Sequence, residues 1–235
     1  MNYNDLGAAI PNPYRIITTI GGIKSMNTKG SLTKSSHLSI QPKILYYGMP
    51  VILATTLNED GTTNISPLSS SWALGRYLVL GMGFGGQGID NLQRTPELVV
   101  NIPDAALWQQ VEKLGSLTGK NPVPDYKAEM GYRYEPDKFT AAGLTPAASL
   151  SVRPQRIAEC PLQIECAVKK ITVPDYAPMF AIVEAEALQI HALPDIVKKK
   201  DSDHIDPSRW NPLIYNFRHY FGLGDRLGNN YRAEV

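Results

Sequence analysis

The chain has 235 residues, of which 43% are hydrophobic and 19% are charged, a composition typical of a globular protein with one large domain or two small ones. Its 23 basic and 22 acidic residues give a net charge of +1, which argues against nucleic acid or an anionic membrane surface as a partner. No apolar run approaches the ~20 residues of a membrane-spanning helix, and the N-terminus lacks the pattern of a secretory signal, so we expect a cytoplasmic protein.

The chain divides into an N-terminal extension and one patterned domain. Residues 1–41 are rich in Asn, Gly, Ser, Thr and Lys, which predicts an extension that is in part disordered. Because regular patterning starts only near Pro42, Met26 is a second candidate for the initiator residue. Residues 42–235 are the predicted globular domain.

The first half of this domain carries β-strand patterns. The run Val51–Leu57 is continuously apolar or β-branched, as in a strand buried on both faces. Asn58–Gly61 is a hairpin signal, because its glycine can adopt a positive φ, and the return strand follows at Thr62–Ser66. We expect further strands at Tyr77–Met82 and Leu98–Ile102.

Helix signals in the same region are few and short. Ile89–Arg94 predicts a short helix that ends before Pro96. Asp104 can cap a second helix, which ends near Gly115. Residues 116–146 are rich in Pro, Gly, Tyr and Lys and predict a long irregular excursion, of the kind that commonly serves a site or an interface.

The second half adds two more strands, near residues 160–172 and 179–191, and an aromatic tail at Trp210–Gly224. Many short strands with few helices indicate a mainly β fold built as an antiparallel barrel.

The cysteine and histidine pattern predicts no metal or disulfide. Cys160 and Cys166 would point to the same face of a strand, with Leu162 and Ile164 between them, too far apart for a disulfide. We therefore expect buried free thiols. His191 ends a predicted strand without ligand-like neighbours, and nothing supports a metal site.

The segment 64–72, NISPLSSSW, is the first that could carry chemistry. Its hydroxyls and amide can pair with phosphate oxygens or with the polar edge of a heteroaromatic ring, and Trp72 offers a flat apolar surface. The alternative interpretation is a Ser-rich turn beside a core tryptophan.

Two further segments are candidates. The loop Gly81–Asn91 is glycine-rich and opens a helix, which suits a bound phosphate, although it is neither a P-loop nor a dinucleotide fingerprint. The alternative is a flexible hairpin loop. Arg218, His219 and Tyr220 place a cation, a titratable ring and a phenol together in the tail, which could orient a ligand or move protons. The alternative is a tail that packs its aromatic rings on the barrel.

Taken together, these segments resemble the flavin reductase-like family, which includes flavoredoxins, ferric reductases and the reductase components of two-component flavin monooxygenases. The pieces that carry the resemblance are PVILATTLNEDGTTNISPLSSSW, LVLGMG and IDNLQRTPELVVNI within residues 50–102, followed by KFTAAGLTP, ECPLQIEC and PLIYNFRHYFGLG. Together they cover most of residues 42–224, and their shared order makes the resemblance specific.

The resemblance implies an antiparallel, Greek-key-like split β-barrel with a few short helices, which binds FMN near the subunit interface of a homodimer. The flavin-binding residues that it implies around the ring and phosphate are Asn64, Ser66, Pro67, Ser69, Ser70, Ser71 and Trp72. Those that it implies at the phosphate loop are Gly86, Gln87, Gly88 and Asn91. The tail residues that match a segment closing over flavin or nicotinamide are Arg218, His219 and Tyr220.

Two positions depart from the family pattern. Relatives often have Thr where this chain has Gly88, so that a phosphate-binding hydroxyl is missing, and the backbone N–H groups of residues 86–88 would have to compensate. Relatives also often have an aromatic residue where Ala73 stands, which would open the pocket or remove a stacking surface.

The function that the resemblance implies is reduction of FMN by NADH or NADPH, with hydride transfer to flavin N5 and electrons passed to an oxygenase or another acceptor protein. Arg218 or His219 would offset negative charge on the reduced flavin. One alternative is an electron carrier like flavoredoxin, without nicotinamide activity. The other is a β-barrel interaction module that has lost its cofactor.

Overall fold

The computed structural model describes residues 37–198 and 203–231. Most of the predicted extension at residues 1–41, and the candidate initiator Met26, lie outside the described residues. None of the helices in the described part of the chain is long and apolar enough to cross a membrane.

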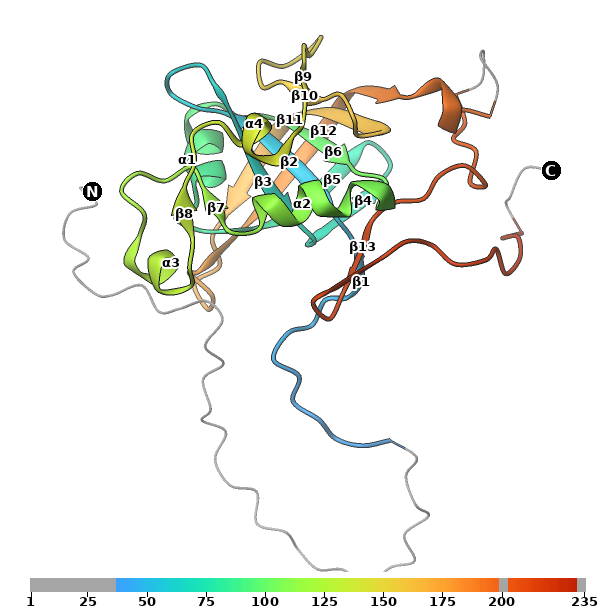
Figure 1. Ribbon diagram of the computed structural model, residues 1–235, viewed down its shortest axis with the longest axis horizontal. Helices are drawn as coiled ribbons and strands as arrows, with labels where there is room; N and C mark the ends of the chain where they lie inside the picture. Colours follow the sequence, from blue (N-terminus) through green and yellow to red (C-terminus); the bar gives the residue numbers. More distant parts are fainter. Residues whose placement is uncertain (1–36, 199–202, 232–235) are drawn as a thin grey trace, which may run out of the picture.

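A single antiparallel sheet organises the molecule (Figure 1). Its seven strands run in the spatial order β3-β2-β6-β11-β12-β5-β4. In chain order they are β2 (Ile52–Leu57), β3 (Thr63–Leu68), β4 (Ser71–Leu74), β5 (Tyr77–Gly83), β6 (Glu97–Ile102), β11 (Leu162–Thr172) and β12 (Phe180–Ala192). The sheet curls into a half-barrel, so the predicted mainly β, antiparallel class is confirmed.

Smaller elements close the sheet. In one minor sheet, β13 (Ile214–Asn216) pairs with β1 (Tyr47–Pro50) on one side and with β14 (His219–Phe221) on the other. Two further pairs join β9 (Pro146–Ala147) to β10 (Arg156–Ile157) and β7 (Leu117–Thr118) to β8 (Arg133–Tyr134). The α-helices are α1 (Gln87–Arg94), α2 (Trp108–Leu114), α3 (Asp125–Glu129) and α4 (Lys138–Ala142), and the 3₁₀ turns are η2 (Ala105–Leu107) and η3 (Pro194–Ile196).

Strand β2 lies between two hydrophobic clusters, which explains its uninterrupted apolar sequence. Ile52 and Ala54 belong to the cluster that packs on α1, whereas Leu53 belongs to the cluster that contains α2 and α4. Successive side chains of a strand point to opposite faces, so a strand buried on both faces needs apolar residues at every position. At its end, Gly61 takes the predicted positive φ of 84° in the turn to β3.

The segment 116–146 is only in part the irregular excursion that its composition predicts. It contains β7, α3, β8 and α4. These elements are only two to five residues long, too short to show a hydrophobic period. The signals that could have located α4 are its caps: the Asp137 side chain accepts from Thr140 N–H, and Gly143 ends the helix in the left-handed conformation.

The two cysteines do not share a strand face. Cys160 precedes β11 and belongs to the cluster with α2 and α4, whereas Cys166 lies on β11 in the other cluster. A register shift between Glu165 and Cys166 interrupts the expected alternation. Both thiols are buried and free, as predicted, and burial raises the pKa of Cys166 to about 12.

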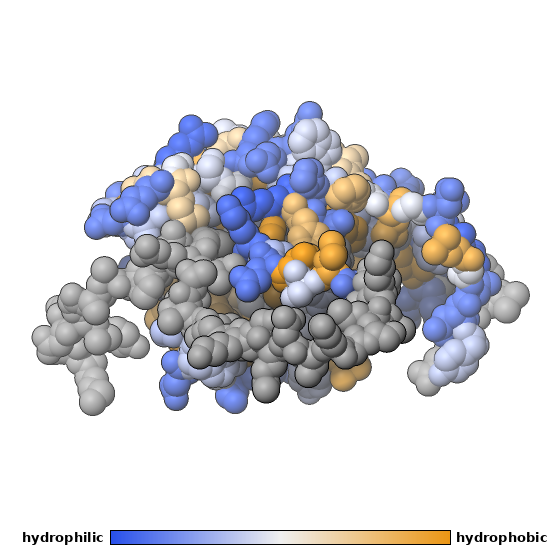
Figure 2. Space-filling model, turned by 90° about the horizontal axis from the view of Figure 1, so that it is seen from below, coloured by the Kyte–Doolittle hydropathy of each residue, from blue (hydrophilic) through white to orange (hydrophobic). Residues whose placement is uncertain are grey.

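The aromatic tail is a β-hairpin. Asn216 pairs with His219, and the two residues between them, Phe217 and Arg218, have positive φ values of 43° and 70°. This is the pattern of a two-residue type I′ turn, which usually contains Asn or Gly. Seen from below, apolar side chains gather near the middle of one face of the molecule, with hydrophilic ones around them (Figure 2).

Candidate functional site

A cavity of about 600 Å³ lies where β3 and β5 meet the start of α1. The segment from α2 to α3 and the C-terminal hairpin complete its wall. Its volume falls within the range of small-molecule sites, which is about 300–1,000 Å³.

One end of the cavity is suited to an anion. The start of α1 contributes Gly86, Gln87 and Gly88, and the N-cap residue Gly86 makes no side-chain capping bond. The N–H groups of the first helical turn have no partner within the helix, so those of Gln87 and Gly88 are available to a ligand. The Lys127 amino nitrogen lies 3.7 Å from the place where a Cβ on Gly86 would stand.

Lys127 is a partly buried cation at this end. Its amino group lies 5.8 Å from the centre of the Tyr132 ring and 6.0 Å from that of Tyr126. Burial and, to a smaller degree, the charge of Lys120 lower the pKa of Lys127, while Lys120 itself pairs with Asp90 of α1. A bound anion beside Lys127 would offset this burial of positive charge.

A buried lysine at the cavity wall contacts strand β3. Lys138 is 3% exposed, and its amino group donates to Asn64 Oδ1 and to the Ile65 carbonyl, both at 2.8 Å. Asn64 Nδ2 in turn donates to Ser66 Oγ at 3.1 Å. Burial, and then the charge of Lys127, lower the pKa of Lys138 to about 7, although Glu135 acts in the opposite direction.

Tyrosines form another part of the cavity wall. The rings of Tyr46 and Tyr215 are 5.4 Å apart between centres, and those of Tyr215 and Tyr220 are 5.6 Å apart. Tyr220 donates to Glu112 Oε2 at 2.9 Å. Burial and this bond raise the pKa of Tyr220, so the phenol is protonated at neutral pH.

Many of the predicted site residues line this one cavity, although they are far apart in sequence. They are Ser66, Pro67, Ser69, Ser70, Gly86, Gln87, Gly88, Arg218 and Tyr220. The remaining predicted residues do not line it; they are Asn64, Ser71, Trp72, Asn91 and His219.

Most of the residues outside the cavity have identifiable places. Asn64 and Asn91 are buried and support the wall: Asn64 orients Ser66, and Asn91 donates to Thr56 Oγ1 at 3.0 Å. Trp72 lies on the edge strand β4 and is 58% exposed. His219 is exposed, and its Nδ1 lies 3.0 Å from the carbonyl oxygen of Phe217, two residues earlier in the chain.

Sequence reasoning missed several cavity residues. Lys127 and Lys138, with Tyr126 and Tyr132, come from the segment 116–146, whose richness in Lys and Tyr was the available signal. Tyr46 and Tyr215 also line the cavity.

The structure accounts for the two departures from the family pattern differently. A Cβ on Gly88 would stand 2.8 Å from Met82 Cε and 3.1 Å from Ser66 Oγ. The space of a larger side chain at position 88 is therefore already filled. Ala73 is exposed on β4 and does not line the cavity, so its small size does not open the pocket of the single chain.

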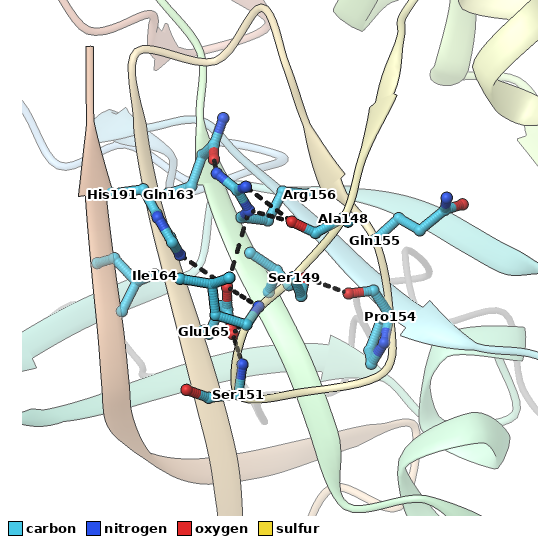
Figure 3. Close-up of polar contacts among 12 residues, drawn as sticks. Ala148, Ser149, Ser151, Pro154, Gln155, Arg156, Gln163, Ile164, Glu165 and His191 are labelled. Atoms are coloured by element: carbon cyan, nitrogen blue, oxygen red, sulfur yellow. Dashed lines mark hydrogen bonds and ion pairs between the residues drawn. The ribbon is translucent and has the colours of Figure 1, made fainter. Parts of the chain in front are cut away.

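A second buried polar cluster lies away from the cavity (Figure 3). The Glu165 side chain is fully buried, and it accepts from the N–H groups of Leu150 and Ser151 and from His191 Nε2, the last at 2.7 Å. Arg156 Nε lies 3.7 Å from Glu165 Oε1. The expectation that His191 lacks such a neighbour was wrong, because β11 and β12 pair only in the folded sheet and bring Glu165 beside it.

Burial opposes the ionisation of Glu165, but its hydrogen bonds outweigh this effect and lower its pKa. The cluster fastens the loop before β10 to the sheet. It presents no group to the cavity.

Residues 44–224 match the model of the flavin reductase like domain. The chain is 56% identical over 196 residues to the Bacillus subtilis (strain 168) protein YdfE, which is described as uncharacterized, and the match covers 83% of this chain and 94% of that protein.

Solved structures share the fold at low sequence identity. Flavoredoxin of Desulfovibrio vulgaris (Miyazaki F) has a TM-score of 0.66 and 19% identity, over 88% of this chain and 99% of that one. Nitrilotriacetate monooxygenase component B from Bacillus cereus has a TM-score of 0.63 and 15% identity, over 89% of this chain and 100% of that one. These likenesses confirm the predicted split-barrel fold.

The chain belongs to the flavin reductase-like family. Membership supports a flavin cofactor and a flavin-related oxidoreductase function.

Proposed function

We propose that this protein binds FMN in the cavity and reduces it with NADH or NADPH, supplying electrons to an oxygenase or another acceptor protein. The observation that carries the proposal is the polarity of the cavity. Unpaired helix-start amides and Lys127 lie at one end, and the hydroxyls of Ser69 and Ser70 lie with tyrosines along the walls. An elongated ligand with an anionic tail and a flat, polar-edged ring matches this arrangement.

The residues present fit such a ligand. The N–H groups of Gln87 and Gly88, with Lys127, would hold the phosphate. Ser69 and Ser70 would donate to or accept from the polar edge of the ring.

When bound, the flavin supplies the redox chemistry, because its N5 accepts hydride from a nicotinamide. The protein supplies position and electrostatics. Arg218, at the cavity wall, would offset negative charge that develops on the reduced cofactor. Tyr46, Tyr215 and Tyr220 would limit the access of water.

A visible spectrum tests this function directly. The purified chain is mixed with FMN, separated from free FMN, and treated anaerobically with NADH or NADPH. We expect retained yellow absorbance that the nicotinamide bleaches. Bleaching by dithionite but by neither nicotinamide would indicate an electron carrier, and failure to retain any flavin would contradict the flavin proposal.

We also propose that the protein forms a homodimer with the flavin near the subunit interface. Exposed apolar side chains on the β4–β5 edge support an association surface: Trp72 is 58% exposed, Leu74 75% and Tyr77 57%. Light scattering should give twice the mass of the chain, and a monomer at micromolar concentration would contradict this part of the proposal.

A further inference from the structure

Lys138 fixes the direction of a short chain of hydrogen bonds. Lysine has no hydrogen-bond acceptor when it is charged, so the atom of Asn64 that faces Lys138 must be the acceptor Oδ1. When the amine loses one proton, its two remaining N–H groups still match its two acceptors, Asn64 Oδ1 and the Ile65 carbonyl, so the same arrangement stays fully hydrogen-bonded.

The orientation of Asn64 then determines the role of Ser66. With Oδ1 turned to Lys138, the donor Nδ2 faces Ser66 Oγ at 3.1 Å. Because Ser66 Oγ accepts this bond, the hydrogen of the hydroxyl is left to donate elsewhere. Ser66 lines the cavity, so an acceptor on a ligand is the partner that this hydrogen can reach.

The position of Ser66 indicates which part of the ligand it meets. Its Oγ lies 3.1 Å from the place where a Cβ on Gly88 would stand. Gly88 is the second residue of α1, in the first turn with its available N–H groups. The Ser66 hydroxyl therefore lies next to the anion-binding end of the cavity, in space that a side chain at position 88 would otherwise occupy.

We propose that Lys138, acting through Asn64, holds the Ser66 hydroxyl as a donor to the phosphate of the bound flavin. This inference rests on the proposed function. Ser66 thereby replaces, from a neighbouring strand, the hydroxyl that position 88 lacks. Lys138 is a positioning residue, and Ser66 is the group that touches the ligand.

The test compares FMN with riboflavin, which has the same ring and no phosphate. Dissociation constants of both are measured by flavin fluorescence titration for the wild type and for Ser66→Ala, Asn64→Asp and Lys138→Met. Asn64→Asp is the sharpest variant. Its carboxylate still accepts from Lys138 but cannot donate, so Ser66 must turn its hydrogen toward residue 64. Ser151→Ala and Lys113→Met, both outside the cavity, are the matched controls.

We expect Ser66→Ala and Asn64→Asp each to weaken FMN binding about tenfold, as for loss of one hydrogen bond to a charged acceptor, with riboflavin binding unchanged. Lys138→Met should reduce the preference for FMN in the same way. Combining Ser66→Ala with Asn64→Asp should add nothing further, because both remove one interaction. The controls should keep the wild-type preference.

An unchanged ratio of FMN to riboflavin affinity in Ser66→Ala or Asn64→Asp would overturn the inference while leaving the proposed function intact. A folded Lys138→Met that keeps the ratio would overturn the role of Lys138. If Lys138→Met fails to fold, the comparison of Ser66→Ala with the double variant decides, because a further loss of FMN affinity in the double variant would measure the negative charge that Asn64→Asp introduces and not the orientation of Ser66. A wild type that binds neither flavin would instead contradict the proposed function itself.

Discussion

This protein has two buried polar clusters, each centred on an ionisable side chain, but their hydrogen bonds lead to different places. Around Glu165, hydrogen-bond donors from a loop and from strand β12 converge on one carboxylate, Arg156 adds an ion pair, and every partner of the carboxylate named here belongs to the protein (Figure 3). Around Lys138, the bonds run in one direction, through Asn64 to Ser66, and the last hydroxyl faces a cavity.

We expect one cluster to contribute mainly to the stability of the fold and the other mainly to ligand binding. A buried charge whose partners all belong to the protein fixes the fold, because removing it leaves several groups unpaired at once. A buried amino group at the start of an open chain of hydrogen bonds can instead orient a group toward a ligand. The two clusters should therefore respond to mutation in different measurements.

The largest effect should come from Glu165→Ala. It leaves His191 and two backbone N–H groups without their partner and removes the ion pair with Arg156, and breaking a buried charged network of this kind costs about 3 kcal/mol or more. The free energy of unfolding, measured in urea, should fall by that amount, and the FMN affinity of the folded fraction should not change. Glu165→Gln, which keeps the shape and some acceptors, should lose less. A stable Glu165→Ala protein with weakened FMN binding would reverse the roles of the two clusters.

The pH dependence of stability should separate the clusters next. The folded pKa of Lys138 is about 7, below its unfolded value of about 10.4. Between these values the unfolded chain holds a proton that the folded chain has released, so stability rises with pH, by at most ~1.4 kcal/mol per pH unit. Lys127 and Glu135 are the charged groups that act on Lys138. From pH 6 to pH 8, the unfolding free energy of the wild type should therefore rise relative to that of Lys138→Met. A constant difference between the two proteins would contradict this.

Glu165 should influence the pH dependence of stability at acid pH. Its folded pKa is lowered, so its contribution is complete above its unfolded pKa of about 4.3 and is lost as pH falls through the folded value. Acid unfolding of Glu165→Gln should therefore show a weaker pH dependence than that of the wild type. Equal acid profiles would mean that Glu165 titrates as it does in the unfolded chain.

Gly88→Ala should affect binding more than stability. The new methyl group meets the flexible end of Met82 and the Ser66 hydroxyl, while alanine favours the helix over glycine by about 1 kcal/mol. We expect the unfolding free energy to change little and the FMN affinity to fall up to about tenfold as Ser66 is displaced. Gly224→Ala, where the added Cβ meets nothing within 4 Å, is the control. Unchanged FMN affinity would show that Ser66 does not need its present position.

The smallest effect should distinguish two neighbours in the tail. Arg218 lines the cavity, whereas His219 does not. Arg218→Ala should weaken FMN binding a few-fold, as expected for an exposed charge interaction of up to about 1 kcal/mol, and His219→Ala should leave affinity and turnover unchanged. A larger loss in His219→Ala than in Arg218→Ala would show that the hairpin rearranges when the ligand binds.

Part of the site could be predicted from sequence because its residues are contiguous. The serine-rich segment that runs from β3 toward β4 and the glycine-rich start of α1 are local patterns, and residues of both line the cavity. His191 and Lys138 could not be assigned in this way. Their partners, Glu165 and Asn64, are 26 and 74 residues away in the chain, and no local pattern reports a contact made by strand pairing or by a helix that packs on a strand.

The sequence by itself determined the mainly β class, the hairpin at Gly61, the doubly buried β2 and the flavin reductase-like family, because alternation, turn chemistry and motif order are properties of neighbouring residues. Only the tertiary structure decided which polar residues are buried and in which direction their hydrogen bonds run. Burial and hydrogen-bond direction depend on partners from distant segments, and the chain brings Lys138 to Asn64 only when α4 packs against β3.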